Sequence, residues 1–215
     1  TRAASERHII QGMRAFSSNL DRALALAASA HRHQERKGSG VPYITHPVHA
    51  AMILIKYSFP EDAVVAAVLH DVVEDTDVPL AEIGRQFGQA VQHLVDQVSE
   101  VKHAAAAPTE RLPWPVRKQE QLARLGHADP LTAAVKSADA LHNCQSMLQD
   151  LTKDGPAAWQ RFRSTPEEQI WYYSTLAALL RTRLGGHPIS DELDEAVSQL
   201  QRLQREHSDA SVPRP

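Results

Sequence analysis

Signals for helix starts recur along the whole chain, whereas signals for β-strands are scarce. Segments with helical spacing of apolar residues open at or beside Pro47, Pro60, Pro130 and Pro166. A proline in the first helical turn loses no hydrogen bond that the helix would otherwise make. Aromatic residues make up only 5% of the chain, and no stretch alternates apolar and polar residues between hairpin turns. The sequence therefore predicts an all-α fold.

Local capping signals and the apolar spacing together locate the helices. Asp129 supplies an N-cap before Pro130, and Thr165 opens a capping box that Glu168 completes. Ser190 precedes a first turn with two acidic residues, which favours a helix start there. The predicted helices cover 20–36, 46–56, 61–76, 80–87, 89–103, 114–126, 130–150, 157–163, 166–184 and 190–206.

The length and hydrophobic content of the chain predict one domain. A chain of 215 residues with 42% hydrophobic residues can bury one sizeable core. We expect a partly helical N-terminal extension over 1–19, a single helical bundle over 20–206 and a frayed C-terminal tail over 207–215. An alanine run followed by three prolines predicts a mobile surface loop over 104–115, close to the functional site.

Charge and cysteine content exclude several function classes. The formal net charge is −3, which gives no basic field of the kind that holds proteins on nucleic acid. The single cysteine, Cys144, cannot form an internal disulfide, and we expect it to be a packing residue in a cytoplasmic protein. No apolar run reaches the roughly 18 residues of a membrane span. We expect neither a membrane nor a nucleic-acid partner, and a homo-oligomer stays open.

Four ionisable residues end the most apolar predicted helix. Residues 63–69 carry no polar side chain, and His70, Asp71, Glu74 and Asp75 follow directly. On a helix, His70 and Glu74 share one face, as do Asp71 and Asp75. Burying these groups unpaired would be costly, and a divalent cation would resolve the conflict by taking an imidazole and a carboxylate as ligands. The alternative is a solvated helix end at which acidic residues gather by chance.

Two further residues could complete a metal site. His46 precedes Pro47 at a predicted helix start, a rigid position for an imidazole, although it could also be an ordinary N-terminal helix residue. Asp139 lies in an apolar helix, where a carboxylate needs a partner. Lys136 and Asn143 stand three residues before and four residues after it, so the three side chains share a face. A surface Lys–Asp pair is the alternative.

The order of the motifs resembles a known family. The chain is similar to the hydrolase half of RelA/SpoT proteins and, more narrowly, to stand-alone small alarmone hydrolases. The resemblance covers about residues 20–185 and rests on Ala30-His31, Gln34, Arg36-Lys37, Gly40-Val-Pro-Tyr-Ile-Thr-His-Pro47, Ala67-Val-Leu-His-Asp-Val-Val-Glu-Asp-Thr76, Phe87-Gly88 and Lys136-Ser-Ala-Asp-Ala-Leu-His-Asn143.

The resemblance implies a fold, an activity and a set of roles. The family has an all-α HD-domain fold, usually binds manganese and removes pyrophosphate from the 3′ position of (p)ppGpp, a small nucleotide. Glu74 and Asp75 would orient or deprotonate the attacking water. The implied metal ligands are His46, His70, Asp71 and Asp139. The implied substrate contacts are Arg36, Lys37, Tyr43, Lys136 and Asn143.

Departures from the family pattern leave the substrate open. RelA/SpoT proteins usually carry Asn-Leu-Arg where this chain has Asn143-Cys-Gln145, so a cation near the site is missing. Guanine and adenine alarmones both stay open, as does another HD phosphohydrolase activity on a deoxynucleotide, a nucleoside monophosphate or NADPH. A catalytically silent module that binds a nucleotide is a further alternative. Glu74 and Asp75 count against it, because a pure binder needs no proton-handling pair.

Overall fold

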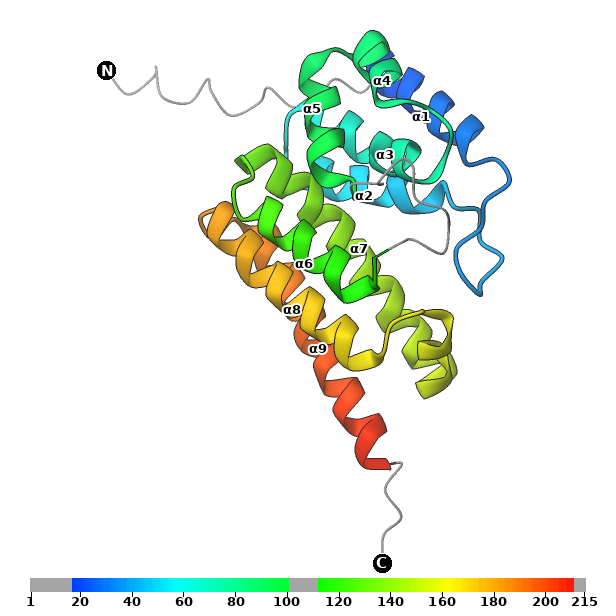
Figure 1. The fold of residues 1–215 in the computed structure, drawn as a ribbon, viewed down its shortest axis with the longest axis vertical. Coiled ribbons are helices and arrows are strands. Elements are labelled where there is room, and N and C mark those ends of the chain that lie inside the picture. Colours follow the sequence, from blue (N-terminus) through cyan, green and yellow to red (C-terminus); the bar gives the residue numbers. More distant parts are fainter. Residues whose placement is uncertain (1–16, 101–111, 211–215) are drawn as a thin grey trace, which may run out of the picture.

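The computed structural model describes residues 17–100 and 112–210, which form α-helices and one 3₁₀ segment (Figure 1). Within these two ranges there is no strand, and only an isolated bridge joins Glu35 to Pro42. The predicted all-α class is confirmed. The elements are α1 Ser18–Ala30, α2 Thr45–Lys56, α3 Glu61–Asp75, α4 Leu80–Phe87, α5 Gln89–Val98, α6 Trp114–Leu125, α7 Pro130–Asp154, η2 Gly155–Arg161, α8 Pro166–Arg183 and α9 Pro188–Ala210.

Helix α3 is the central element of the fold. Every residue from 63 to 72 is buried, because α1, α2, α5 and α7 all pack against this helix. The apolar run read from the sequence is therefore a helix enclosed by neighbours, as expected for a helix that is hydrophobic all round. Its C-terminal end carries His70 and Asp71 into the same enclosed region. The core thus positions both residues rigidly.

Helix α7 connects the two halves of the molecule. It spans 25 residues and packs against α2, α3 and α5 on one side of the fold and against α8 and α9 on the other (Figure 1). Asp129 caps its start by accepting hydrogen bonds from the N–H groups of Leu131 and Thr132, as predicted. Asp139 lies in its middle and is buried. Because α7 is long and packs against α3, the Asp139 carboxylate lies beside the end of α3.

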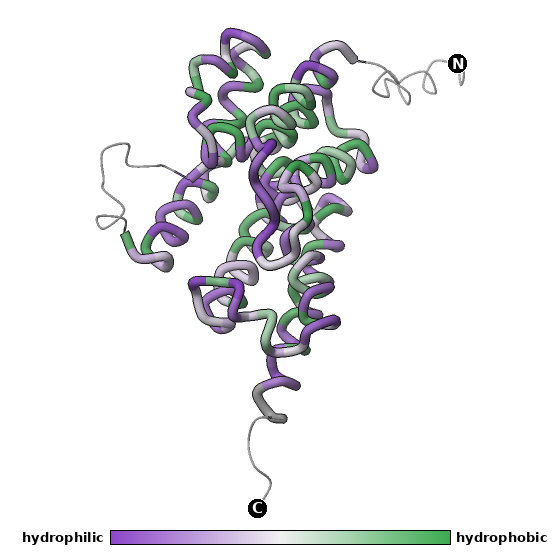
Figure 2. Tube along the Cα trace, turned by 90° about the vertical axis from the view of Figure 1, so that its right-hand side faces the viewer, coloured by the Kyte–Doolittle hydropathy of each residue, from purple (hydrophilic) through white to green (hydrophobic). Residues whose placement is uncertain are grey.

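The first helix ends earlier than predicted. The expected helix over 20–36 stops at Ala30, and a hydrophilic loop leads from there to α2. Two kinds of hydrogen bond favour the loop over a longer helix. The Gln34 amide donates to the carbonyl of Asp75 at the end of α3, and the Arg36 N–H donates to Val41 O within the loop. Arg36 and Lys37 therefore lie on a loop and not at a helix C-terminus. The loop lies at the right in Figure 1, and its residues 31–37 face the viewer in Figure 2.

Several other predicted boundaries also move. Helix α6 begins at Trp114, inside the predicted loop over 104–115, and residues 101–111 of that loop lie outside the described residues. The short predicted helix over 157–163 is the 3₁₀ segment η2. Helix α9 begins at Pro188, two residues before the predicted start, and continues to Ala210, beyond the expected start of a frayed tail at 207. The N-terminal extension is described only from Ser17, which caps α1.

None of the helices within 17–100 and 112–210 is both long enough and apolar enough to cross a bilayer.

Candidate metal centre

Four side chains from three helices meet beside the end of α3. His46 Nε2 lies 3.2 Å from Asp139 Oδ1 and 3.5 Å from Asp71 Oδ2. His70 Nε2 lies 3.2 Å from Asp71 Oδ2 and 3.7 Å from Asp139 Oδ1. His46, His70 and Asp139 each offer a ligand atom within 4.8 Å of the others, and all three residues are buried. The predicted ligand residues therefore lie together, with Asp71 against both imidazoles.

The chemistry of His70 fits a cation in this cluster. Its Nδ1 lies 2.7 Å from the carbonyl oxygen of Ala67, which can only accept, so Nδ1 carries the proton. Burial opposes a charge on this ring, but without a cation the carboxylates of Asp71 and Asp139 raise the pKa of His70 well above its usual value, so Nε2 also carries a proton. This buried nitrogen has no hydrogen-bond partner among the described residues. A divalent cation would take the place of the Nε2 proton, with the imidazole and the two carboxylates as its ligands.

A buried lysine balances part of the negative charge. Lys136 Nζ donates to Asp139 Oδ2 at 2.7 Å, and both side chains are about 9% exposed. Burial opposes the charge on each group, yet Lys136 holds the pKa of Asp139 well below its usual range. Burial likewise opposes ionisation of Asp71, but His70 and His46 lower its pKa. Both carboxylates are therefore ionised and able to serve as ligands.

The predicted proton-handling pair lies one turn beyond the ligands of α3. Glu74 is partly buried, and its Oε2 accepts a hydrogen bond of 3.0 Å from the backbone N–H of Glu100. Burial, followed by the negative charge of Asp71, raises the pKa of Glu74 to about 7. Asp75 is exposed, and its carboxylate accepts from the Tyr43 hydroxyl at 3.3 Å. Glu74 is thus tuned to exchange a proton near neutral pH.

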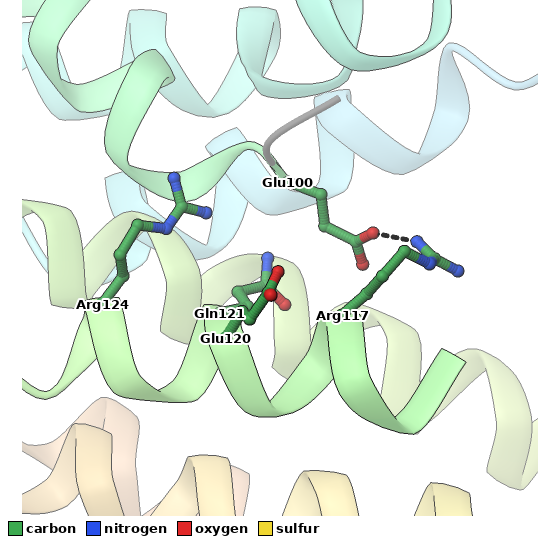
Figure 3. Close-up of a pocket in the computed structure, with 5 residues that line it drawn as sticks. All are labelled: Glu100, Arg117, Glu120, Gln121 and Arg124. Carbon is green, nitrogen blue, oxygen red and sulfur yellow. Dashed lines mark hydrogen bonds and ion pairs between the residues drawn. The ribbon is translucent and has the colours of Figure 1, made fainter. Parts of the chain in front are cut away.

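Side chains of helix α6 hold Glu100, the residue whose backbone N–H group donates to Glu74. The Glu100 carboxylate pairs with Arg117 on α6 (Figure 3). It also pairs with Lys118 on the same helix. Arg124, two turns further along α6, donates to the carbonyl of Ser99 at 2.6 Å. The end of α5 is therefore fixed from one side, together with the Glu100 N–H. Sequence reasoning missed Glu100, because nothing local in the sequence links it to α3.

Three of the predicted substrate contacts, Arg36, Tyr43 and Asn143, are linked to the cluster by hydrogen bonds. The Arg36 guanidinium donates to Asn143 Oδ1 at 3.0 Å, and the Asn143 amide donates to Asp139 Oδ1 at 2.7 Å. The guanidinium carbon of Arg36 also lies 5.7 Å from the ring centroid of Tyr43. The Tyr43 hydroxyl donates to Asp71 Oδ2 at 2.7 Å. These residues form one connected network, whereas Lys37 is exposed on the loop.

Two histidines that sequence reasoning missed adjoin the centre. His142 Nδ1 lies 2.7 Å from His46 Nδ1, and His142 Nε2 lies 3.0 Å from Nδ1 of the exposed His49. Burial, together with the positive charge of His46 when protonated, lowers the pKa of His142 to about 3, so its ring is neutral. The spacing of His46 and His49 on one helix was visible in the sequence, but the crossing of α2 and α7 was not.

Comparisons with known proteins agree with this fold and cluster. The HD domain family matches residues 23–165. The mouse guanosine-3′,5′-bis(diphosphate) 3′-pyrophosphohydrolase MESH1 is 37% identical over 187 residues, which cover 86% of this chain and 93% of the relative. The bifunctional (p)ppGpp synthase/hydrolase SpoT of Escherichia coli is 32% identical over 82% of this chain, but the match spans only 23% of SpoT.

A solved structure of a similar protein has a similar fold. It is described as a metazoan ortholog of SpoT that hydrolyses ppGpp, and it superimposes with a TM-score of 0.67 at 29% identity. The match covers 86% of this chain and 96% of that one. The family match over residues 23–165 includes the whole cluster, from His46 on α2 to Asp139 on α7. The chain therefore belongs to the HD-domain family.

Proposed function

We propose that this protein is a metal-dependent hydrolase that removes the 3′ pyrophosphate from guanosine-3′,5′-bis(diphosphate) or a closely similar nucleotide. The observation that carries the proposal is the enclosed cluster of His46, His70, Asp71 and Asp139 with Glu74 directly beyond it. The names of the similar proteins support the substrate class. Because the match covers 93% of the mouse and human relatives of that name, the similarity extends over nearly their whole length.

The ligand set supports a divalent cation, and we propose Mn²⁺ as the resident ion. Two imidazoles and two carboxylates suit a borderline-hard ion of this kind. When bound at this centre, the cation supplies Lewis-acid polarisation of a phosphoryl oxygen and lowers the pKa of a water molecule.

The single cysteine is buried and unpaired, which agrees with a cytoplasmic location.

Glu74 is proposed to accept the proton of the attacking water. Its pKa of about 7 leaves it partly ionised at neutral pH, and the Glu100 N–H fixes one carboxylate oxygen. The water oxygen bonds to the phosphorus next to the ribose, and the bond from that phosphorus to the 3′ oxygen breaks. The nucleotide leaves as a 5′-diphosphate with a protonated 3′ hydroxyl, together with intact pyrophosphate. Asp75, beside the Tyr43 hydroxyl, is proposed to orient the water.

The substrate is proposed to lie between the cluster and the loop after α1. Arg36 has an aromatic ring on one side and Asn143 on the other, so its guanidinium is held in place for a purine or a phosphate. Lys37 is exposed on the same loop and is proposed to meet the 5′ phosphates as a point charge. Lys136 is proposed to act near the 3′ phosphates, because it lies beside Asp139.

A substrate panel tests the proposal. Purified protein with Mn²⁺ is incubated with ppGpp, pppGpp, ppApp, NADPH and nucleoside monophosphates, and the products are separated by chromatography. We expect the bis(diphosphate) nucleotides to be hydrolysed and chelation to stop turnover. Turnover of NADPH or a monophosphate alone would point to another HD phosphohydrolase. Nucleotide binding without turnover of any substrate would contradict an enzyme.

A further inference from the structure

Three imidazoles form a continuous chain from the candidate metal centre to the surface. His46 Nε2 faces Asp71 and Asp139, while its Nδ1 lies 2.7 Å from His142 Nδ1. His142 Nε2 in turn lies 3.0 Å from Nδ1 of His49, which is exposed. His46 and His49 come from α2 and His142 from α7. The chain therefore depends on the packing of these two helices.

The direction of the hydrogen bonds follows from the chemistry at the metal end. An imidazole that binds a cation through Nε2 presents a lone pair there, so its proton is on Nδ1. His46 then donates from Nδ1 to His142 Nδ1, which must be a lone pair. His142 must therefore carry its own proton on Nε2 and donate it to His49 Nδ1. One assignment at His46 fixes the tautomer of all three rings.

The two metal-binding imidazoles are held in different ways. His70 donates its Nδ1 proton to the carbonyl of Ala67, a fixed acceptor one turn earlier in the same helix. For His46, the partner at Nδ1 within the described part of the chain is the His142 ring and not a backbone carbonyl. A ring that binds a metal usually donates its second N–H to an acceptor that fixes its orientation. For His46 this acceptor is a side chain, which a substitution can remove.

We propose that His142 is a positioning residue that holds His46 in its metal-binding tautomer, and that His49 holds His142. This inference rests on the proposed metal centre and adds two residues to it. Without metal, the opposite polarity places the His46 proton on Nε2, within 3.2 Å of Asp139 Oδ1. In that state His142 donates from Nδ1 to His46, and His49 donates from Nδ1 to His142.

Metal binding therefore reverses the chain while each ring keeps one proton. With a cation held at His46 Nε2, that nitrogen would lose its proton, and His46 would gain the Nδ1 proton of His142. His142 gains the Nδ1 proton of His49 at its Nε2, and His49 takes a proton from solvent at its exposed end. One proton is lost at the centre and one is gained at the surface, so the three rings together keep their charge.

Metal affinity measured by chelator competition tests the positioning role. His142→Phe keeps a flat ring but removes the acceptor, and we expect it to weaken Mn²⁺ and Zn²⁺ binding about 10- to 100-fold. His142→Asn places an amide oxygen close to the lost Nδ1, and we expect its affinity to return to within about threefold of wild type. The matched control His93→Phe removes an exposed histidine that pairs with Asp129. Circular dichroism and melting of the metal-free variants check folding.

Nitrogen-15 NMR of the imidazoles tests the reversal independently of activity. Zn²⁺ serves as the diamagnetic probe, and the His49→Phe and His142→Asn spectra assign the signals. We expect His142 to change from the Nδ1–H to the Nε2–H tautomer when Zn²⁺ is added. His142 that stays in the Nδ1–H form with Zn²⁺ bound would overturn the inference.

The affinity results also separate this inference from the proposed function. Wild-type affinity in a folded His142→Phe variant would overturn the role of His142, and the metal centre would stand. Equal losses in His142→Phe and His142→Asn would also overturn it, because the loss would then come from packing and not from the acceptor. Absence of metal binding by the wild-type protein would overturn both proposals.

Discussion

Replacing Glu74 by glutamine is expected to stabilise the metal-free protein at alkaline pH. The same substitution is expected to abolish most of the activity of the metal-loaded protein. The carboxyl group has a pKa of about 7 in the folded protein, against 4.5 for an ordinary glutamate. The folded state therefore binds this proton more tightly than the unfolded state. Stability from this group is complete below about pH 4 and is lost as pH rises through about 7. Glutamine stays neutral throughout, so it avoids this loss.

The size of the effect follows from the two pKa values. A rise from 4.5 to about 7 corresponds to ~3 kcal/mol at pH 8 and to less than ~1 kcal/mol at pH 5. For a domain of this size, ~3 kcal/mol raises the melting temperature by roughly 6 to 12 °C. The amide oxygen of glutamine can still accept the hydrogen bond from Glu100 N–H, so that contact is kept.

Urea unfolding of the wild type and Glu74→Gln at pH 5 and pH 8, with chelator present, measures this difference. Turnover of the metal-loaded variant should fall by roughly 10²–10⁴, because glutamine cannot accept a proton. Glu82→Gln is the matched control: it removes a half-buried carboxylate whose pKa is lowered by Arg85, so it should bring a small loss at pH 8. A Glu74→Gln variant no more stable than wild type at pH 8 would refute the reasoning.

Three further experiments test other parts of the site. His46→Ala or Asp71→Ala should abolish bound metal and leave a helical protein; unchanged metal content by elemental analysis would contradict the ligand assignment. Gly38→Ala should raise KM several-fold, because its Cβ would lie 2.7 Å from Arg161 Nε, whereas Gly40→Ala has a similar positive φ and open space and should change KM less. Similar KM values for Gly38→Ala and Gly40→Ala would contradict the idea that the position of this loop affects substrate binding. Lys136→Met should destabilise the metal-free protein by ~3–5 kcal/mol, because it leaves Asp139 buried without its cation. Added Mn²⁺ should raise the melting temperature of Lys136→Met more than that of the wild type, and an equal rise would contradict this.

Much of the fold and of the metal cluster was predictable, because the signals are local. The apolar run before His70 and the proline and cap residues at Asp129 and Thr165 each define a helix from a few neighbouring residues. Lys136, Asp139 and Asn143 share a helix face by spacing alone, and the structure joins them by hydrogen bonds.

The parts that could not be predicted depend on contacts between distant segments. Helix α1 ends at Ala30 because the following loop bonds to itself and to the end of α3, and helical spacing carries no trace of this. His142 meets His46 only where α2 crosses α7, and Glu100 meets Glu74 only at the end of α5. Sequence patterns predicted the residues that are proposed to bind the metal, whereas the residues that are proposed to position them needed the three-dimensional structure.

Product analysis in ¹⁸O-labelled water tests the central claim most directly. The Mn²⁺-loaded protein is given ppGpp, and the products are identified by chromatography and mass spectrometry. The proposed attack at the phosphorus next to the ribose predicts GDP without label and intact pyrophosphate carrying one ¹⁸O atom. Release of inorganic monophosphate, or label on the 3′ oxygen of the nucleotide, would contradict the assignment of this centre as a 3′-pyrophosphohydrolase.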